Sequence, residues 1–431
     1  MPSRPSHRQN ARSAAHQILC DWDPDKRWAE KLIAQHAKNL RDDDQRLATR
    51  LVMGTLQHLR TLDFVLTPML RNGIDSVAPT SLWALRLGVE QLLFTRIPAH
   101  AAVSETVSLV SKHQRGFVNA IMRRVQREKS EITAKLEEAP APVRYSIPDK
   151  LFNRWVEAYG EDATIALCEV INEPAPTTFR INELKPDARQ RIEASGIAIS
   201  PVEDWEDYYQ VADPKQSIPA DWFEQGWIYA QDPAASVAVR TLAPQPGEQV
   251  LDACAAPGGK TFLTALAINN QGNITATDSD PDRIERIEEN CQRLGITCAS
   301  TATTDWTDLD ATLDVPAAVL IDAPCSNTGV LRRRIDARYR KTTLNPGPIT
   351  STQRRILANI LTRIPDGGRC VYSTCSIDPA ENAHCVHRVI DELTSSHPEL
   401  KLTFVEDHQT LPHIDDVDGH YAALIKIERQ A

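Results

Sequence analysis

Two cysteines of this chain each lie in a turn of small or polar residues that follows a short apolar segment. Cys325 belongs to Asp322-Ala-Pro-Cys-Ser326, and Cys375 belongs to Ser373-Thr-Cys-Ser376. A free cysteine is most often an inert buried side chain, but its thiolate is a strong nucleophile that also leaves readily. Because there are two such turns and one of them contains an acid, the pattern favours chemistry and nominates Cys325, Cys375 and Asp322.

A glycine turn between a predicted strand and a predicted helix is the second chemical feature. It lies in Gln249-Val-Leu-Asp-Ala-Cys-Ala-Ala-Pro-Gly-Gly-Lys-Thr261, where the two glycines let the backbone turn and approach a ligand. Asp278 stands twenty residues after Gly258 and follows the predicted strand 274–277. A carboxylate at that place can accept hydrogen bonds from ribose hydroxyl groups.

The glycine turn can be compared with three kinds of ligand loop. A phosphate-binding P-loop requires a glycine six places before its lysine, and Cys254 occupies that place before Lys260. A dinucleotide fingerprint requires three spaced glycines, whereas this turn has two adjacent ones. S-adenosylmethionine (AdoMet) carries no phosphate, and it needs only a close backbone and an acid for its ribose. The turn therefore favours AdoMet, and a purely structural turn is the alternative.

Strands and helices alternate from Trp227 to the end of the chain, which predicts a doubly wound, Rossmann-like α/β sheet. Ligands bind such sheets beyond the carboxyl ends of the strands, where four polar clusters fall: 252–260, Asp278, Asp305 with 322–326, and 373–376. The predicted strands are 249–251, 274–277, 299–303, 317–321, 369–372, 402–404 and 421–425.

Two further regions precede this predicted sheet, and 431 residues suggest roughly three domains. Helical periodicity runs through residues 1–140, which predicts an all-α bundle. Residues 145–226 combine a predicted helix at 150–171 with short strands at 177–182 and 197–199. This second region is therefore expected to be a small α+β insert, and residues 227–431 form the third domain.

The net charge of −10 opposes nucleic-acid binding, so the distribution of basic residues matters more than the total. The stretches Lys112–Lys129 and Arg332–Lys341 each contain six Lys or Arg residues and a single acid. A solvated helix face is the ordinary interpretation of a single charge run, but Lys112, Arg115, Arg123 and Arg124 of the first stretch could also meet phosphates. The second follows Cys325 closely and is expected to line the path of a nucleic-acid backbone. Phe179, Arg180 and Asn182 in the insert could also stack on or bond to a nucleotide, although an ordinary core strand is the better interpretation of Phe179.

Several classes of protein are disfavoured by composition. No apolar run approaches the roughly 18 residues of a membrane-spanning helix, and the opening Met1–Arg8 lacks the apolar stretch of a signal peptide. The expected compartment is the cytoplasm, with no membrane partner. The nine cysteines form no paired short-spaced motif, which argues against a zinc site or a disulfide framework and favours free thiols.

Four segments of the helical region resemble the NusB-like antitermination fold, whose members bind RNA. They are Asp44-Gln-Arg-Leu-Ala48, Leu51-Val-Met-Gly54, Ile97-Pro-Ala-His-Ala-Ala-Val103 and Arg115-Gly-Phe-Val-Asn-Ala-Ile-Met-Arg-Arg124. The two cysteine turns, set after Ala253-Cys-Ala-Ala-Pro-Gly-Gly-Lys260, resemble those of the RNA cytosine-C5 methyltransferases of the Nol1/Nop2/Sun family. Together these likenesses cover nearly the whole chain. They imply a NusB-like RNA-binding domain, a substrate-binding insert and a Rossmann-like AdoMet methyltransferase domain.

The same resemblance implies AdoMet as the cofactor and small-subunit ribosomal RNA as the partner, with no DNA expected. It implies that Cys375 is the nucleophile and that Cys325 assists product release. The residues that it implies for AdoMet binding are Cys254, Ala255, Ala256, Pro257, Gly258, Gly259, Lys260, Asp278, Asp305 and Asp322. The family usually shows His-Pro after its paired arginines, and Arg334-Ile335 departs from that pattern, which leaves substrate placement open.

The chemistry of this family has a physical reason, because carbon 5 of cytosine is too weak a nucleophile to accept a methyl group unaided. Addition of a thiolate at carbon 6 makes the ring enamine-like, so that carbon 5 can attack a sulfonium methyl group. Asp322 is the nearest candidate for stabilising ring nitrogen 3 of the adduct. The attacking sulfur must reach the face of the ring, so the base has to be unstacked or presented in a loop.

Other functions remain as alternatives. An RNA-binding assembly factor without turnover would have no use for the intact pair Cys325 and Cys375. An AdoMet enzyme acting on a small molecule or on DNA would have no use for the helical region or the stretch Arg332–Lys341. Amino-group methylation would call for an Asp/Asn-Pro-Pro-aromatic turn where this chain has Asp322-Ala-Pro-Cys325. Methylation of another ribosomal or transfer RNA cytosine is a further possibility.

Overall fold

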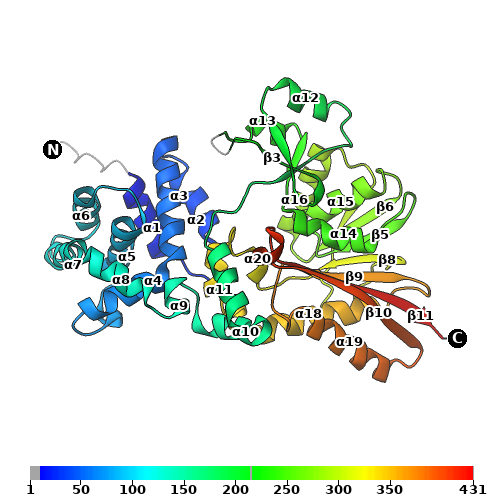
Figure 1. The fold of residues 1–431 in the computed structure, drawn as a ribbon. Coiled ribbons are helices and arrows are strands. Elements are labelled where there is room, and N and C mark those ends of the chain that lie inside the picture. The colour runs from blue at the N-terminus through cyan, green and yellow to red at the C-terminus, as the bar shows by residue number, and fades with distance from the viewer. Residues whose placement is uncertain (1–9, 214–215, 431) are drawn as a thin grey trace, which may run out of the picture. The chain divides into compact units, whose positions relative to one another are not determined.

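The computed structural model describes residues 10–213 and 216–430. The expectation for the opening segment Met1–Arg8 therefore concerns residues outside this description. The chain divides into two compact units, Met1–Asn172 with Arg334–Leu344, and Glu173–Arg333 with Asn345–Ala431. Both sheets belong to the second unit (Figure 1). In the part of the chain that the model describes, no helix is long and apolar enough to cross a membrane.

The first unit consists of helices and contains no strand in its described residues, as predicted for the N-terminal region. Its helices are α1 Ala11–Asp21, α2 Ala29–Ala37, α3 Asp42–Gln57, α4 Leu59–Leu66, α5 Pro79–Phe94, α6 Ala99–Ser108, α7 Arg115–Arg127, α8 Lys129–Glu137, α9 Ala141–Arg144, α10 Asp149–Tyr159, α11 Glu161–Val170 and α17 Lys341–Leu344.

Helix α7 shows how the sequence pattern produces the packing of this unit. Its apolar residues recur at spacings of three and four, which places them on one face of a helix. The buried residues on that face are Val118, Ile121, Met122 and Val125. They join a core that also receives side chains from α4, α5 and α6. The opposite face of α7 carries its basic residues into solvent.

The predicted helix at 150–171 is interrupted in the structure. Helix α10 ends at Tyr159 and α11 begins at Glu161, because Gly160 between them has φ 83°, outside the right-handed helical region. Both helices belong to the first compact unit, whereas the sequence pattern groups them with the α+β insert.

The second unit begins with a four-stranded antiparallel sheet in the order β2-β3-β1-β4. Its strands are β1 Phe179–Ile181, β2 Ile199–Val202, β3 Trp205–Val211 and β4 Ile228–Ala230, and its helices are α12 Ala188–Ala194 and α13 Ala220–Glu224. The sequence predicts β1 and β2 but not β3, because β3 contains Glu206 and Asp207, and acidic residues are depleted in strands. Strand β4 extends the sheet beyond residue 226, the predicted end of the insert.

A seven-stranded sheet in the order β10-β11-β9-β8-β5-β6-β7 forms the rest of the second unit. Its strands are β5 Gln249–Ala253, β6 Asn273–Asp278, β7 Ala299–Thr303, β8 Ala318–Asp322, β9 Arg369–Thr374, β10 Leu400–Thr410 and β11 His420–Arg429. Strands β5 to β9 are parallel, and β11 is antiparallel to both of its neighbours. All seven predicted strands are present. The order reverses at β5, so the carboxyl ends of β5, β6, β8 and β9 meet at one edge of the sheet.

Helices cover both faces of this sheet (Figure 1). The helices are α14 Val237–Leu242, α15 Gly259–Ala267, α16 Pro281–Leu294, α18 Gly347–Leu361, α19 Ala383–Ser396 and α20 Pro412–Asp415. Alternate residues of β5 point to opposite faces. Val250 packs in a core with α14 and α15, and Leu251 packs in a core with α18 and α19. The helices therefore hold the strand ends, and the turns that follow them, in fixed positions.

Candidate active site

The turn after β5 brings the backbone to the carboxyl edge of the sheet. Cys254 has φ 60° and Gly258 has φ 98°, and α15 begins at Gly259. The Ala255 amide donates to the carbonyl oxygen of Thr277 in β6, with an N to O distance of 2.7 Å, and this bond ties the turn to the neighbouring strand. The left-handed backbone at Gly258 is one that side chains disfavour, so the turn requires glycine there.

Asp278 ends β6 and offers an acceptor at this edge. Its side chain is 2 % exposed. Its Oδ1 accepts from the Asp280 amide at 3.2 Å and lies 3.2 Å from Nη1 of Arg283. Its Oδ2 is buried and has no hydrogen-bonding partner among the described residues. A buried polar atom without a partner costs on the order of 1–3 kcal/mol, so a ligand that donates a hydrogen bond fits this place, as a ribose hydroxyl would.

Asp252 in β5 provides a second buried carboxylate beside Asp278. Its Oδ2 accepts from Thr261 Oγ1 at 2.6 Å, and its Oδ1 has no partner among the described residues. Burial raises the pKa of Asp252 to about 7, and the charges of Asp322 and Asp278 act in the same direction. Several acids thus converge on this edge, and a cationic ligand such as a sulfonium suits their combined charge.

Lys260 supplies the balancing cation. It lies on the first turn of α15 with Nζ 2.8 Å from Oδ1 of Asp322, the last residue of β8. Burial acts to lower the pKa of Lys260, but the charges of Asp322 and Cys375 oppose it and raise the pKa above its ordinary value. Lys260 therefore stays an ammonium group, and its charge acts on Cys375.

The two cysteine turns meet at the same edge. The sulfur atoms of Cys325 and Cys375 are 3.1 Å apart, and both cysteines are free and partly exposed. The hydrogen bond with Cys375, together with burial, raises the pKa of Cys325 well above its ordinary value. The oxygen Oδ1 of Asn327 lies 3.4 Å from the Cys375 sulfur. The structure thus brings together the two cysteines that the sequence nominates, with Lys260 and Asp322 nearby.

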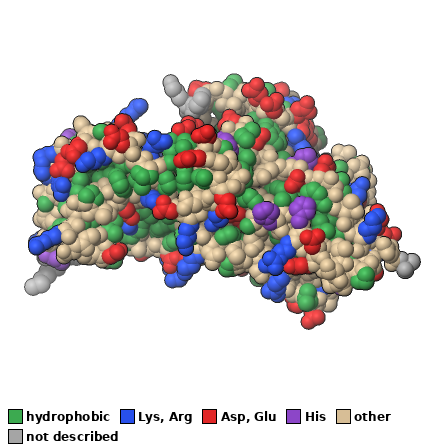
Figure 2. Space-filling model, turned by 60° about the horizontal axis from the view of Figure 1, so that its bottom comes forward, with side chains coloured by type: hydrophobic (Ala, Val, Ile, Leu, Met, Phe, Trp, Pro, Cys, Tyr) green, Lys and Arg blue, Asp and Glu red, His purple; other side chains and the backbone are tan. Residues whose placement is uncertain are grey.

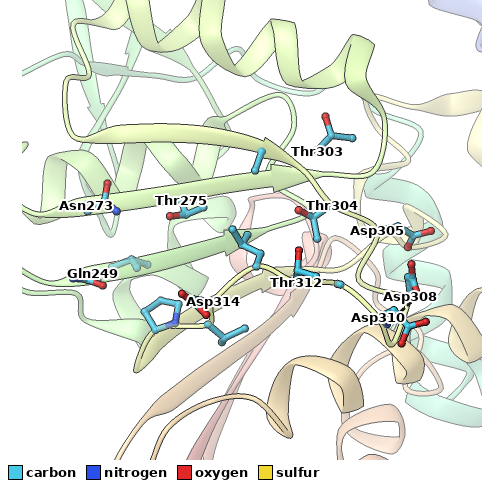
Figure 3. Close-up of a pocket in the computed structure, with 16 residues that line it drawn as sticks. Gln249, Asn273, Thr275, Thr303, Thr304, Asp305, Asp308, Asp310, Thr312 and Asp314 are labelled. Atoms are coloured by element: carbon cyan, nitrogen blue, oxygen red, sulfur yellow. Dashed lines mark hydrogen bonds between the residues drawn. The ribbon is translucent and has the colours of Figure 1, made fainter.

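Asp305 lies next to Asp278 but is exposed. The amide of Thr304 donates to the Asp278 carbonyl oxygen at 2.9 Å, and Asp305 Oδ1 accepts from the amide and the hydroxyl of Thr307, which lower the pKa of Asp305. Asp305 also lines a cavity of about 750 Å³. Figure 3 shows Asp305, Asp308 and Asp310 at one end of this cavity, with Gln249 and Asn273 at the other. Asp305 is the one predicted site residue in the lining of this cavity.

Two buried residues at this edge escape the sequence analysis. Glu381 accepts hydrogen bonds from both cysteine turns. His420 begins β11 and is 3 % exposed, and neither of its ring nitrogens has a partner among the described residues. Burial and the charge of Lys260 lower the pKa of His420 well below its ordinary value, so its ring is neutral. The acid in Asp378-Pro-Ala-Glu-Asn382, six residues after Cys375, is the sequence signal that could have identified Glu381.

The expectation that Arg332–Lys341 lines an RNA path is wrong for most of the stretch. Arg333 is held by two carboxylates, with Nε 2.7 Å from Asp418 Oδ2 and Nη2 2.8 Å from Asp232 Oδ2. The side chain of Arg332 is 6 % exposed, and its Nη2 donates to the Pro174 carbonyl oxygen at 3.1 Å. These guanidinium groups are committed to the fold of the second unit.

The rest of this stretch belongs to the first unit. Arg338 is 0 % exposed, and its Nη1 donates to Asn172 Oδ1 at 3.1 Å. Arg334 and Arg340 both lie over the ring of Trp28, with guanidinium carbons 5.1 Å and 4.2 Å from its centre. Arg334 stays exposed beside this ring, and Lys341 is the other exposed cation of the stretch.

Helix α7 and the turn before it are a different case, because their basic residues stay accessible. Lys112, Arg115, Arg123 and Arg127 are exposed or partly exposed, and Arg124 pairs with Glu128 at 3.0 Å. Figure 2 shows that basic and acidic side chains are interspersed over the face that it presents. That basic residues of α7 and the turn before it meet phosphates therefore stays a prediction.

Asn182 is likewise committed to structure. It is fully buried, and its Nδ2 donates to the carbonyl oxygens of Gly226 at 2.9 Å and Leu294 at 2.8 Å. This pair of bonds links the small sheet to the end of α16. The expectation that Asn182 bonds to a nucleotide is therefore wrong.

Family models match three consecutive parts of the chain. The model described as NusB family matches residues 9–127, and a ferredoxin-like domain of RsmF/B-like methyltransferases matches residues 147–216. The model described as 16S rRNA methyltransferase RsmB/F matches residues 239–426. The order of these three matches is the order of helical region, α+β insert and α/β sheet in the structure.

Curated relatives extend over nearly the whole chain. A probable ribosomal RNA small subunit methyltransferase B of Bacillus subtilis is 32% identical, covering 96% of this chain and 97% of the relative. The ribosomal RNA small subunit methyltransferase B of Serratia proteamaculans is 33% identical over 90% of this chain and 92% of its own. The crystal structure of the protein PH0851 has the same fold, with a TM-score of 0.73 at 22% identity over 97% of this chain and 99% of that chain. With its glycine turn and paired cysteines, this chain belongs to the 16S rRNA methyltransferase RsmB/F family of AdoMet-dependent enzymes.

Proposed function

We propose that this enzyme methylates carbon 5 of one cytosine in 16S rRNA through a covalent adduct between Cys375 and carbon 6 of the base. The observation that carries the proposal is the 3.1 Å separation of the Cys325 and Cys375 sulfur atoms at the carboxyl edge of the sheet. A structural role for either thiol alone would not require two sulfurs there. Other ribosomal or transfer RNA cytosines are the alternative substrates.

AdoMet fits the edge formed by β5, β6 and β8. The turn 254–260 would pass along it, the unpartnered Oδ2 of Asp278 would accept from its ribose, and Asp305 and Asp322 would complete its surroundings. When bound, AdoMet supplies an electrophilic methyl group on a sulfonium. The proposed cytoplasmic location follows from the ribosomal RNA substrate.

The protonation of the cysteine pair supports the assignment of their roles. The hydrogen bond with Cys375 and burial raise the pKa of Cys325 well above its ordinary value, so Cys325 holds its proton. The ammonium group of Lys260 would stabilise a thiolate on Cys375. Attack of that thiolate on carbon 6 moves a ring electron pair to carbon 5.

The later steps use the remaining groups. Ring nitrogen 3 takes a proton from solvent as the thiolate adds and returns it when the ring is restored. Asp322, held by Lys260, accepts a hydrogen bond from this protonated nitrogen and so stabilises the adduct. After methyl transfer, carbon 5 still carries a proton. Cys325, which is partly exposed, releases its own proton to solvent, and its thiolate then removes the carbon-5 proton. The electron pair of that bond restores the ring double bond, and the bond between Cys375 and carbon 6 breaks with Cys375 leaving as a thiolate. A thiol of high pKa gives a thiolate that is a strong base, which suits Cys325 to this step.

Bisulfite sequencing of RNA from cells with and without this protein tests the proposal. Methylation protects a cytosine from deamination by bisulfite. Loss of the protein should remove this protection from one 16S rRNA cytosine, and the purified enzyme with AdoMet should restore it. Protection lost only in transfer RNA or 23S rRNA would move the activity to the alternative substrates. Unchanged protection in every RNA would favour a non-catalytic assembly factor.

A further inference from the structure

Glu381 joins the two turns that carry the cysteines. Its Oε2 accepts from the Ser326 amide at 2.8 Å and from Gln353 Nε2 at 3.0 Å. Its Oε1 accepts from Ser376 Oγ at 2.7 Å and also from Ser326 Oγ. Ser326 directly follows Cys325, and Ser376 directly follows Cys375. One carboxylate therefore holds both turns, at the residue next to each sulfur.

The partners of Glu381 are suited to a carboxylate rather than to a neutral side chain. The Ser326 amide and the Gln353 side-chain nitrogen can only donate, and the two serine hydroxyls donate to the remaining oxygen. Glu381 is 0 % exposed, and burial raises its pKa while the bonds from Ser326 and Ser376 lower it. Keeping a charge at this depth costs stability, which a residue serving only the packing would avoid.

The two turns lack regular secondary structure that would otherwise fix them. Asn327 has a left-handed backbone with φ 63°, and the amide of Gly329 donates to the carbonyl oxygen of Cys375 at 3.0 Å. Beside Glu381, Asn382 Oδ1 accepts from Thr374 Oγ1 at 2.6 Å. The segment that carries Glu381 is thus buried and accepts hydrogen bonds from both cysteine turns.

We propose that Glu381 is a positioning residue that sets the separation and orientation of Cys325 and Cys375 during the methylation cycle. The inference rests on the proposed function, in which one sulfur attacks carbon 6 and the other removes a proton from the adjacent carbon 5. The two sulfurs must therefore address neighbouring atoms of one ring. A displacement of about 1 Å at such a site slows catalysis by about 100-fold.

The substitution Glu381→Gln tests the inference, because glutamine keeps the shape and removes the charge. Its amide nitrogen donates where the carboxylate accepts, so the serine hydroxyls on one side must turn around. The expected result is a fall in kcat of about 100-fold, with the KM for RNA and the Kd for AdoMet within about twofold of wild type. The melting temperature at pH 8 should not fall, because the buried charge is gone.

Glu392→Gln is the matched control, since Glu392 is exposed on α19 and pairs with Arg388 at 2.8 Å. Its kcat should equal that of wild type.

Two single contacts of Glu381 can also be removed in turn. Ser376→Ala loosens the turn of Cys375 and should slow formation of the RNA adduct, whereas Ser326→Ala loosens the turn of Cys325 and should slow its release, so that adduct accumulates.

The outcomes separate this inference from the proposed function. A Cys325→Ser enzyme that methylates RNA normally without any adduct would remove the covalent mechanism itself. If the covalent mechanism holds and the kcat of Glu381→Gln is within about twofold of that of wild type, the positioning role alone is overturned. The fraction of folded enzyme can be measured by AdoMet binding. If a smaller folded fraction explains the whole fall in kcat, the positioning role is overturned as well, because Glu381 would then be purely structural.

Discussion

Lys260 and Asp322 form an ion pair across the crevice, with Nζ 2.8 Å from Oδ1. Lys260 lies on the first turn of the helix after the glycine turn, and Asp322 ends the strand before the turn of Cys325. The pair therefore joins the proposed AdoMet site to the cysteine site. Side-chain exposures of 10 % for Lys260 and 30 % for Asp322 place the pair mostly away from solvent.

Lys260→Met should destabilise the protein by about 2 kcal/mol, because it leaves the mostly buried Asp322 charge without its partner. Asp322→Asn in the same chain should recover part of that loss. Urea unfolding of the two single variants and the double variant measures the coupling between them. If the changes in unfolding free energy of the two single variants simply add in the double variant, the two side chains do not interact in solution. Single-turnover methylation should be slow in all three variants.

Asp278→Ala should weaken AdoMet binding by about 2 kcal/mol, roughly 30-fold in Kd, because it removes the buried acceptor proposed for the ribose. Isothermal titration calorimetry measures this directly. Asp282→Asn is the control, since Asp282 is exposed on the first turn of α16. An affinity equal to that of wild type in the Asp278 variant would exclude Asp278 from the cofactor site.

The buried carboxyl of Asp252 should make stability depend on pH. Its pKa is raised from an ordinary 3.8 to about 7 in the folded protein, so its stability contribution is full below pH 4 and is lost as pH rises to 7. Asp252→Asn should therefore be more stable than wild type at pH 8, by up to roughly 4 kcal/mol, and should show no gain at pH 4. Chemical denaturation at both pH values measures the difference in unfolding free energy between the variant and wild type. An equal difference at pH 4 and pH 8 would contradict the prediction.

The parts of the site predictable from the sequence are those that depend on local order along the chain. The turn 254–260 and the acids Asp278 and Asp322 follow strands that hydrophobic pattern alone predicts, and parallel strands bring their ends together. The role of Arg333 could not be predicted from local order along the chain. Its partners Asp232 and Asp418 are distant in the sequence, and nothing local distinguishes a buried arginine from one that meets phosphate.

Strand β3 and Glu381 were missed for related reasons. The acidic residues of β3 lie on exposed positions of a small sheet, where tertiary pairing with β1 and β2 outweighs weak strand propensity. Glu381 has the composition of an ordinary surface acid, and its burial depends on donors from two turns that meet only in the folded chain. The departure at Ile335 has a structural role, since Ile335 packs in the core of the first unit.

The corrected positions of the arginines give a prediction on RNA binding. Neutralising Arg123 and Arg127, which are accessible on α7, should flatten the slope of log affinity against log salt by roughly 0.7 per lost contact to single-stranded RNA. Arg338→Met should leave that slope unchanged and lower the melting temperature, because Arg338 is buried. Filter binding across a salt series measures the slopes. A flatter slope for Arg338→Met alone would restore the RNA role of its stretch.

The proposed mechanism requires that Cys375 bonds to the cytosine and that Cys325 releases it. Each cysteine is replaced by serine, mixed with AdoMet and 16S rRNA, and run on a denaturing gel that is read for a slow band which nuclease collapses to free protein. Cys375→Ser should give no methylation and no slow band, because carbon 5 is never activated. Cys325→Ser should give a persistent slow band, because the methylated base stays bonded to Cys375. A band with Cys375→Ser and none with Cys325→Ser would exchange the two roles, and normal methylation without a band in both variants would contradict the covalent mechanism.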